Sequence, residues 1–322
     1  MYALTGKLAL PAAVTRLATR EERKLRELRE RGGVDVDAAV LAKLEPPAMP
    51  QTFILPDDAA GWRRAMRADP AARWVLKSKA HLGKDLRIVA GDDALVAQLL
   101  GGGDGGATKK EGAPGGKYRL AQRYVHPPLL LGNGHKFGLR LWVVLRSTWP
   151  ALQASLYRGG LVLFAEERYS AGGDAAAGGL TNAALNREAE VWSVPALGEH
   201  WARSDLQARL PWETMWARIQ RCLERALVAG EPDLHADAAR AYDEAGGHAS
   251  SRSFQILGAD ILIDAQLTPW LLEMNGTPSL KSEPGSVAEQ AKRQMLADLF
   301  KLVGIDERER PYSLGFEELQ VG

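Results

Sequence analysis

Two apolar runs near the C-terminal end of the chain are separated by only four residues. Residues 259–264 have the sequence ADILID, residues 269–275 have the sequence PWLLEMN, and AQLT connects them. Parallel strands need a crossover of about a dozen or more residues, so strands joined by so short a connection pair in the antiparallel direction. An antiparallel hairpin is therefore predicted here, and it limits the folds that the 322-residue chain can adopt.

The expected register of this hairpin brings acidic side chains together. With AQLT as the loop, Asp264 faces Pro269 and Asp260 lies opposite Glu273. Two carboxylates directly across a ladder repel each other, and a divalent cation with oxygen ligands offsets that repulsion. Asn275 shares the face of Glu273 because side chains alternate along a strand. The three side chains predict a Mg²⁺ site completed by phosphates. The alternative is a solvated sheet edge with unrelated acids, and Asp264 is also expected as a hydrogen-bond acceptor at the turn.

Candidate partners for phosphate lie upstream. Lys77 ends the apolar run RWVLK, and Lys136 begins KFGLR with Arg140 on the same strand face. Cations at these predicted strand ends could neutralise the charge of a nucleotide, although single strand-end lysines are usually solvated. The segment SKAHLGKD contains one glycine and has no Walker pattern, so it is a weak phosphate loop by itself.

Strand and helix patterns alternate along the chain without long repeats, which favours the α/β or α+β class. Half of residues 101–116 are glycine, and such a segment cannot bury a core, so a link or loop is expected there. We expect three parts: a helical, charged N-terminal segment (1–47), a small subdomain with its glycine-rich linker (48–116), and a C-terminal subdomain with the metal site (117–322).

Several local patterns give specific expectations. The sequence ALQASLYRGGLVLFA (151–165) predicts a hairpin turning at Gly159–Gly160. Residues 20–31 predict a solvated helix, residues 231–251 are expected as a polar loop, and residues 286–304 predict an amphipathic helix. Cys222 lies in the helical pattern IQRCLERAL, so a structural role is expected for it.

Bulk properties exclude some functional classes. A formal net charge of +1 gives no global sign of nucleic-acid or membrane-surface binding. A single cysteine rules out a disulfide framework and fits a reducing compartment. No run approaches the ~18 apolar residues of a membrane span, and no signal peptide is expected, although a transit peptide stays open. We therefore expect a cytoplasmic protein with neither nucleic acid nor membrane as its partner.

These motifs occur together, and in the same order, in one known family. The chain resembles the tubulin tyrosine ligase-like proteins over roughly residues 48–304. The matching segments are TFILP (52–56), WVLKSKAHLGKDLRIV (74–89), AQRYVHPPLLLGNGHKFGLRLWVVLRSTWP (121–150), LYRGGLVLFAEERYS (156–170), LTN (180–182) and FQILGADILIDAQLTPWLLEMNGTPSL (254–280).

This resemblance implies an α+β fold of the ATP-grasp type, in which two sheet-containing subdomains clamp ATP, here with a reduced and partly helical N-terminal segment. It implies ATP and Mg²⁺ as cofactors and an amino acid (Glu, Gly or Tyr) joined to a protein carboxylate through an acyl phosphate. The implied metal ligands are Asp260, Glu273 and Asn275, and the implied phosphate-binding lysines are Lys77 and Lys136. The adenine segment is implied to comprise Gln122, Arg123, Tyr124 and Val125, and further active-site positions are Arg140, Thr181 and Asn182.

The chain departs from the family pattern at four positions. Gly138 replaces the acid of the usual KFDLR, Leu163 replaces a usual basic residue, Gly179 replaces the histidine of HLTN, and Asp85 replaces a glycine. Two hypotheses follow: a ligase acting on tubulin or microtubules at the cytoskeleton, a cilium or a flagellum, or a catalytically impaired pseudo-ligase that binds nucleotide or tubulin as an interaction module. A small-molecule ATP-grasp ligase is a third, which the KFxLR and PPLLL motifs disfavour.

Overall fold

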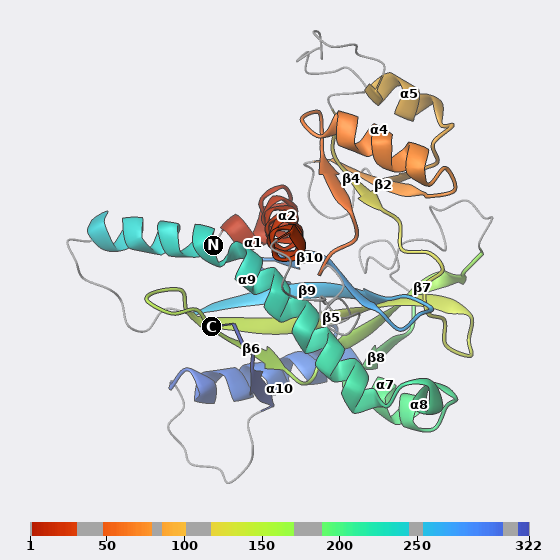
Figure 1. Ribbon diagram of the computed structural model, residues 1–322. Helices are drawn as coiled ribbons and strands as arrows, with labels where there is room; N and C mark the ends of the chain where they lie inside the picture. The colour runs from red at the N-terminus through yellow and green to blue at the C-terminus, as the bar shows by residue number, and fades with distance from the viewer. Residues whose placement is uncertain are drawn as a thin grey trace.

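The computed structural model describes residues 2–30, 48–78, 86–100, 117–170, 189–244, 254–304 and 315–321. These residues form two antiparallel sheets with helices packed against them (Figure 1). None of the helices described combines the length and apolar character needed to cross a bilayer. The mixture of helices and antiparallel sheets agrees with the expected α+β class.

The smaller sheet has the order β1-β4-β2-β3. Its strands are β1 (Thr52–Ile54), β2 (Trp74–Ser78), β3 (Leu86–Val89) and β4 (Tyr118–Arg123). Helices α4 (Ala59–Ala68) and α5 (Ala94–Leu100) cover one face (Figure 1). Trp74, Leu76 and Ala121 bury that face against Trp62 and Leu95. Because side chains alternate along a strand, Lys77, Leu120 and Gln122 lie on the opposite face, toward the larger sheet.

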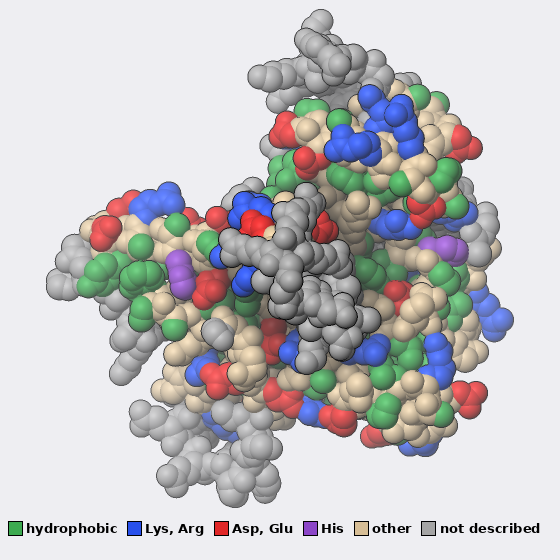
Figure 2. Space-filling model, in the orientation of Figure 1, with side chains coloured by type: hydrophobic (Ala, Val, Ile, Leu, Met, Phe, Trp, Pro, Cys, Tyr) green, Lys and Arg blue, Asp and Glu red, His purple; other side chains and the backbone are tan. Residues whose placement is uncertain are grey.

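Figure 2 shows this lobe standing above the larger body, with Lys and Arg side chains gathered over α4.

The larger sheet has the order β10-β9-β5-β6-β11, with β7 paired to β5 and β8 paired to β7. Its strands are β5 (His135–Ser147), β6 (Gln153–Tyr157), β7 (Leu161–Arg168), β8 (Val191–Ser193), β9 (Gln255–Ile263), β10 (Pro269–Asn275) and β11 (Phe316–Glu318). Strand β5 is thirteen residues long and is the centre of the sheet.

The prediction of a hairpin at Gly159–Gly160 is wrong. In the described sheet β6 and β7 do not pair with each other, because β6 pairs with the second half of β5 and β7 with its first half. They lie in series as one long partner strand, broken at Gly160, whose φ is +151°. A Cβ there would lie 2.8 Å from the Arg140 carbonyl oxygen, so only glycine lets the two strands approach β5 this closely.

Helices cover both faces of the larger sheet (Figure 1). On one face lie α1 (Tyr2–Thr5), α2 (Ala9–Glu30) and α9 (Trp212–Glu244), and two short helices, α7 (Val194–Ala202) and α8 (Leu206–Arg209), lie at the end of α9. On the other face α10 (Val287–Leu302) buries Met295 and Leu299 against Trp142 and Val144. The helix predicted for 286–304 is thereby confirmed.

Two helices extend beyond their predicted limits. Residues 231–244 continue α9, so the polar loop expected there is wrong over this range. Leu234 is fully buried and Asp233 forms an ion pair with Arg16 of α2, which gives this stretch tertiary contacts that its composition hides. Helix α2 begins at Ala9 and not at residue 20, and its first turns bury Leu10 and Val14 in the main core. Cys222 is buried and its thiol donates a hydrogen bond to the Ala48 carbonyl, as a structural role requires.

Candidate nucleotide and metal site

The β9–β10 hairpin forms with a register that differs from the expected one at its start. Ile263 faces Pro269, whereas Asp264 was expected there. A bulge at Leu272 then shifts the pairing by one residue, so Glu273 does lie opposite Asp260, as predicted. The bulge is needed because Leu271 and Met274, three positions apart, both enter the core, which strict alternation of strand side chains does not allow.

The Asp264 carboxylate closes the turn of this hairpin. It accepts the backbone N–H groups of Gln266 and Thr268 at 3.0 and 2.8 Å and the indole N–H of Trp270 at 2.8 Å. The turn role expected for Asp264 is confirmed, and the site beyond it is left to Asp260, Glu273 and Asn275.

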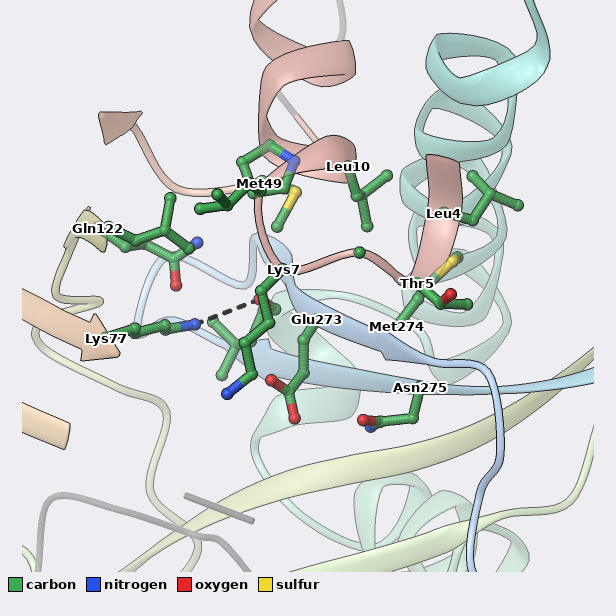
Figure 3. Close-up of a pocket in the computed structure, with 15 residues that line it drawn as sticks. Leu4, Thr5, Lys7, Leu10, Met49, Lys77, Gln122, Glu273, Met274 and Asn275 are labelled. Atoms are coloured by element: carbon green, nitrogen blue, oxygen red, sulfur yellow. Dashed lines mark hydrogen bonds between the residues drawn. The ribbon is translucent and has the colours of Figure 1, made fainter. Parts of the chain in front are cut away.

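The bulge also links the two sheets. The Leu272 carbonyl accepts a hydrogen bond from Lys77 Nζ at 3.4 Å, drawn as a dashed line in Figure 3. Between the Lys77 face of the small sheet and β10 lies a pocket of about 270 Å³. Its lining includes Lys77, Gln122, Glu273 and Asn275, which belong to three different strands. Four of the residues predicted for nucleotide and metal binding therefore line one pocket.

Arg140 holds the Asp260 carboxylate from the neighbouring strand. It lies opposite Asp260 in the β5–β9 ladder and donates from Nε to Oδ1 at 2.5 Å and from Nη2 to Oδ2 at 3.0 Å. The Asn275 amide reaches Oδ2 at 3.4 Å. Burial raises the pKa of Asp260, the Arg140 charge opposes that rise, and the Glu273 carboxylate across the ladder adds to it.

This donor set fits a magnesium ion shared with phosphates. Among the described residues no three acidic, histidine or cysteine side chains cluster, so a site built only from such ligands does not occur there. Two carboxylates and one amide are the incomplete oxygen set that Mg²⁺ takes when a nucleotide supplies the remaining ligands. Asp260 keeps acceptor capacity beyond its bonds to Arg140 and Asn275, because a carboxylate offers about four lone-pair positions.

The two predicted phosphate-binding lysines have different environments. Burial lowers the pKa of Lys77, while the Glu273 carboxylate opposes that shift and the charge of Lys7 adds to it. Lys136 is only 4% exposed, with Nζ 3.3 Å from the Tyr124 hydroxyl and 4.5 Å from the centre of its ring. Burial lowers the pKa of Lys136 to about 7. Both ammonium groups are thus poorly hydrated, and an anion would stabilise their charged forms.

The side chains of the predicted adenine segment point in two directions. Gln122 is buried and donates to the Thr52 hydroxyl at 3.1 Å, and Tyr124 and Val125 are also buried. The Arg123 side chain is exposed and forms an ion pair with Asp69, at the end of α4. Its side chain is therefore engaged outside the pocket.

The departures at 138 and 163 turn out to be neighbours. Gly138 pairs directly with Leu163 in the β5–β7 ladder, on the strand face that also carries Lys136 and Arg140. Of the other predicted positions, Thr181 and Asn182 lie outside the described residues, as do the departures Gly179 and Asp85.

Sequence reasoning missed the contribution of the N-terminal loop. Thr5, Gly6 and Lys7 line the pocket together with Lys77 and Glu273 (Figure 3). The sequence holds only a partial signal: Leu10, Ala13, Val14 and Leu17 have the spacing typical of a helix with a buried face. This spacing does not show that the loop before the helix reaches β10.

Comparison with known proteins gives a family match over most of the chain. The model of the tubulin-tyrosine ligase family matches residues 23–311. The human tubulin monoglutamylase TTLL4 is 29% identical over 281 residues, which cover 81% of this chain and 21% of that protein. The human tubulin polyglutamylase TTLL5 is 27% identical over 80% of this chain and 19% of its own length, and the human tubulin polyglutamylase TTLL7 is 30% identical over 60% and 23%. The chain spans about a fifth of the length of these relatives.

Proposed function

Because this chain belongs to the tubulin-tyrosine ligase family, we propose that it is an ATP-dependent ligase that joins an amino acid to a carboxylate of tubulin. The observation that carries the proposal is that Lys77, Glu273 and Asn275 line one pocket. Asp260 pairs with Glu273 across the hairpin, and Arg140 pairs with Asp260 from the next strand. The three relatives are named as glutamylases of tubulin, which makes glutamate the first amino acid to test.

In this proposal ATP lies between the two sheets, as in the ATP-grasp arrangement. The small sheet, to which β4 also belongs, contributes Lys77 and Gln122, and the larger sheet contributes Lys136, Arg140 and the acidic hairpin. The N-terminal segment is assigned to 1–47, the small lobe to 48–116 together with β4, and the larger lobe to the rest of 117–322. Gln122 and the backbone of residues 123–125 hold the adenine, and Thr181 and Asn182 belong to the acceptor side.

The proposed reaction has two steps. A carboxylate oxygen of tubulin attacks the terminal phosphorus of ATP, the bond to the ADP oxygen breaks, and an acyl phosphate forms. The amine of the incoming amino acid then attacks the acyl carbon, the carbon–oxygen bond to phosphate breaks, and the departing phosphate takes up the proton that the amine loses. A magnesium ion held by Asp260, Glu273 and Asn275 would neutralise phosphate charge. Lys77, Lys136 and Arg140 orient the phosphates and add positive charge around the transferring group.

The first test separates binding from catalysis. Titration calorimetry of the full chain with Mg·ATP should give measurable binding, and Glu273→Gln or Asn275→Ala should abolish it while the far-ultraviolet circular dichroism stays unchanged. Glu199→Gln, an exposed acid on α7, is the matched control and should bind like the original chain. Unchanged nucleotide affinity in the two site variants would refute the metal assignment.

The second test measures ligation. The chain is incubated with tubulin, ATP and radiolabelled glutamate, glycine or tyrosine in separate reactions, and label in the tubulin band is counted. Incorporation that needs ATP and disappears in Glu273→Gln supports the ligase. Mg·ATP binding without incorporation of any of the three amino acids would refute it.

A further inference from the structure

The loop between α1 and α2 carries a lysine into the nucleotide pocket. Thr5, Gly6, Lys7 and Leu8 all belong to the pocket lining. In Figure 3 the Lys7 side chain descends from this loop, and its ammonium group ends beside the Glu273 carboxylate, on the side of Lys77. Lys7 therefore belongs to the same small space as the residues proposed to hold phosphate and metal, although it comes from the opposite end of the sequence.

The position of this loop is fixed by the core on its N-terminal side. Leu4, in α1, is fully buried, and a Cβ added at Gly230 of α9 would lie 2.5 Å from its Cδ2 atom. Thr5 lies against Gly276, where an added Cβ would lie 3.0 Å from Thr5 Cγ2. The absence of side chains at these two glycines lets α1 dock directly beside β10, which places Lys7 next to Glu273.

Ion pairs fix the loop on its C-terminal side. Arg16 of α2 contacts Asp233 of α9 at 2.5 Å, and Arg225 of α9 contacts Glu21 of α2 at 2.7 Å. Helix α2 also buries Leu10, Ala13 and Val14 in the main core. The loop thus spans two anchored helices, and Lys7 is held at the pocket by the fold.

The charges of the pocket indicate what Lys7 binds. Lys7 and Lys77 are two cations in a space of about 270 Å³, and among the described residues that line it Glu273 is the single acid. Two like charges this close repel each other, and an anionic ligand relieves the repulsion. A metal on Glu273 and Asn275 would take up the carboxylate charge, and phosphates bound to that metal would bring negative charge to both lysines.

We propose that Lys7 is a ligand-binding residue of this pocket and that its ammonium group contacts the terminal phosphate of the nucleotide. This inference rests on the proposed function, because it takes Mg·ATP as the ligand. The N-terminal segment is then part of the binding site, since it supplies one of the cations.

The test compares nucleotides of different length. We would measure Kd for Mg·ATP and Mg·ADP by titration calorimetry on the full chain and on Lys7→Gln, Lys7→Arg and Lys24→Gln. Lys24 is exposed on α2 and is the matched control. A charge-assisted hydrogen bond is strong enough that Lys7→Gln should weaken ATP binding roughly tenfold or more. ADP affinity should change less than about threefold because ADP lacks the terminal phosphate. Lys7→Arg should retain most of the ATP affinity, and Lys24→Gln all of it.

The possible failures are distinguishable. If the unsubstituted chain binds no Mg·ATP, the proposed function fails and the inference fails with it. If that chain binds Mg·ATP and Lys7→Gln binds it equally well, only the role of Lys7 is refuted. Equal losses for ATP and ADP would also overturn it, because they place Lys7 away from the terminal phosphate.

Discussion

Lys136 should destabilise the free protein, and this cost can be measured. The side chain is 4% exposed, and burial lowers its pKa from the ordinary 10.5 to about 7. Its ammonium group contacts the ring and the hydroxyl of Tyr124. Replacing Lys136 with methionine keeps an unbranched chain of similar length against the Tyr124 ring and removes the charge.

The sign and size of this effect on stability follow from the linkage between folding and protonation of Lys136. Between pH 7 and 10.5 the unfolded chain binds the Lys136 proton and the folded chain does not, so the stability that depends on this group rises with pH. Below pH 7 folding must bury the charged form, at a cost of about 5 kcal/mol, and this cost disappears as pH rises through 10.5. The cation–π contact and the hydrogen bond to Tyr124 offset about 1–2 kcal/mol. Lys136→Met should therefore gain roughly 3 kcal/mol near neutral pH.

Urea denaturation of the two proteins at pH 7.5 and 9.5 is the assay. The advantage of Lys136→Met should shrink by about 2–3 kcal/mol between these pH values, because the cost in the original chain fades over this range. Lys24→Met, at an exposed position, should show no such change. Equal unfolding free energies for the original chain and Lys136→Met at both pH values would refute the burial of this charge. The same variant should lose affinity for Mg·ATP, so stability and binding are expected to move in opposite directions.

Two further predictions concern glycines of the larger sheet. Gly160→Ala should lower the unfolding free energy by about 2–4 kcal/mol, because its Cβ would lie 2.8 Å from the Arg140 carbonyl oxygen and φ is +151°. Gly91→Ala is the control and should change the unfolding free energy little, because the space around Gly91 is open. Equal stability of the two variants in urea would contradict this prediction. Gly138→Asp alone should lower the unfolding free energy, and Gly138→Asp combined with Leu163→Lys should raise ligase activity. If the double variant is no more active than the original chain, an ion pair at these positions does not support catalysis.

Elements whose apolar side chains recur with a clear strand or helix spacing were predicted from the sequence. The β9–β10 hairpin, the partnership of Asp260 and Glu273, and the amphipathic helix α10 all follow from local spacing. The bulge at Leu272 was not predicted, although the core positions of Leu271 and Met274, three apart, contain its signal. Such a bulge depends on which faces are buried, and a strand pattern considered alone assumes perfect alternation.

Other features depend on contacts between distant segments. The Gly159–Gly160 sequence is equally compatible with a hairpin and with a break in one long strand, and the length of β5 decides between them. Residues 231–244 are polar enough for a loop, yet Leu234 and the Arg16–Asp233 pair hold them in α9. Lys7 enters the pocket only because α1 docks beside β10, and a local reading of a charged N-terminal segment cannot foresee that contact.

The register of β5 and β7 changes the meaning of the departures at 138 and 163. Considered separately, a missing acid and a missing base each suggest damage to a catalytic site. As direct cross-strand neighbours, Gly138 and Leu163 replace two opposite charges with none, so the pair keeps its net charge and no single charge is left buried without a partner. Restoring only the acid would place a carboxylate beside leucine, which is the costly arrangement. Restoring both charges recreates a pair that can satisfy itself, and only this combination tests whether the neutral pair limits catalysis.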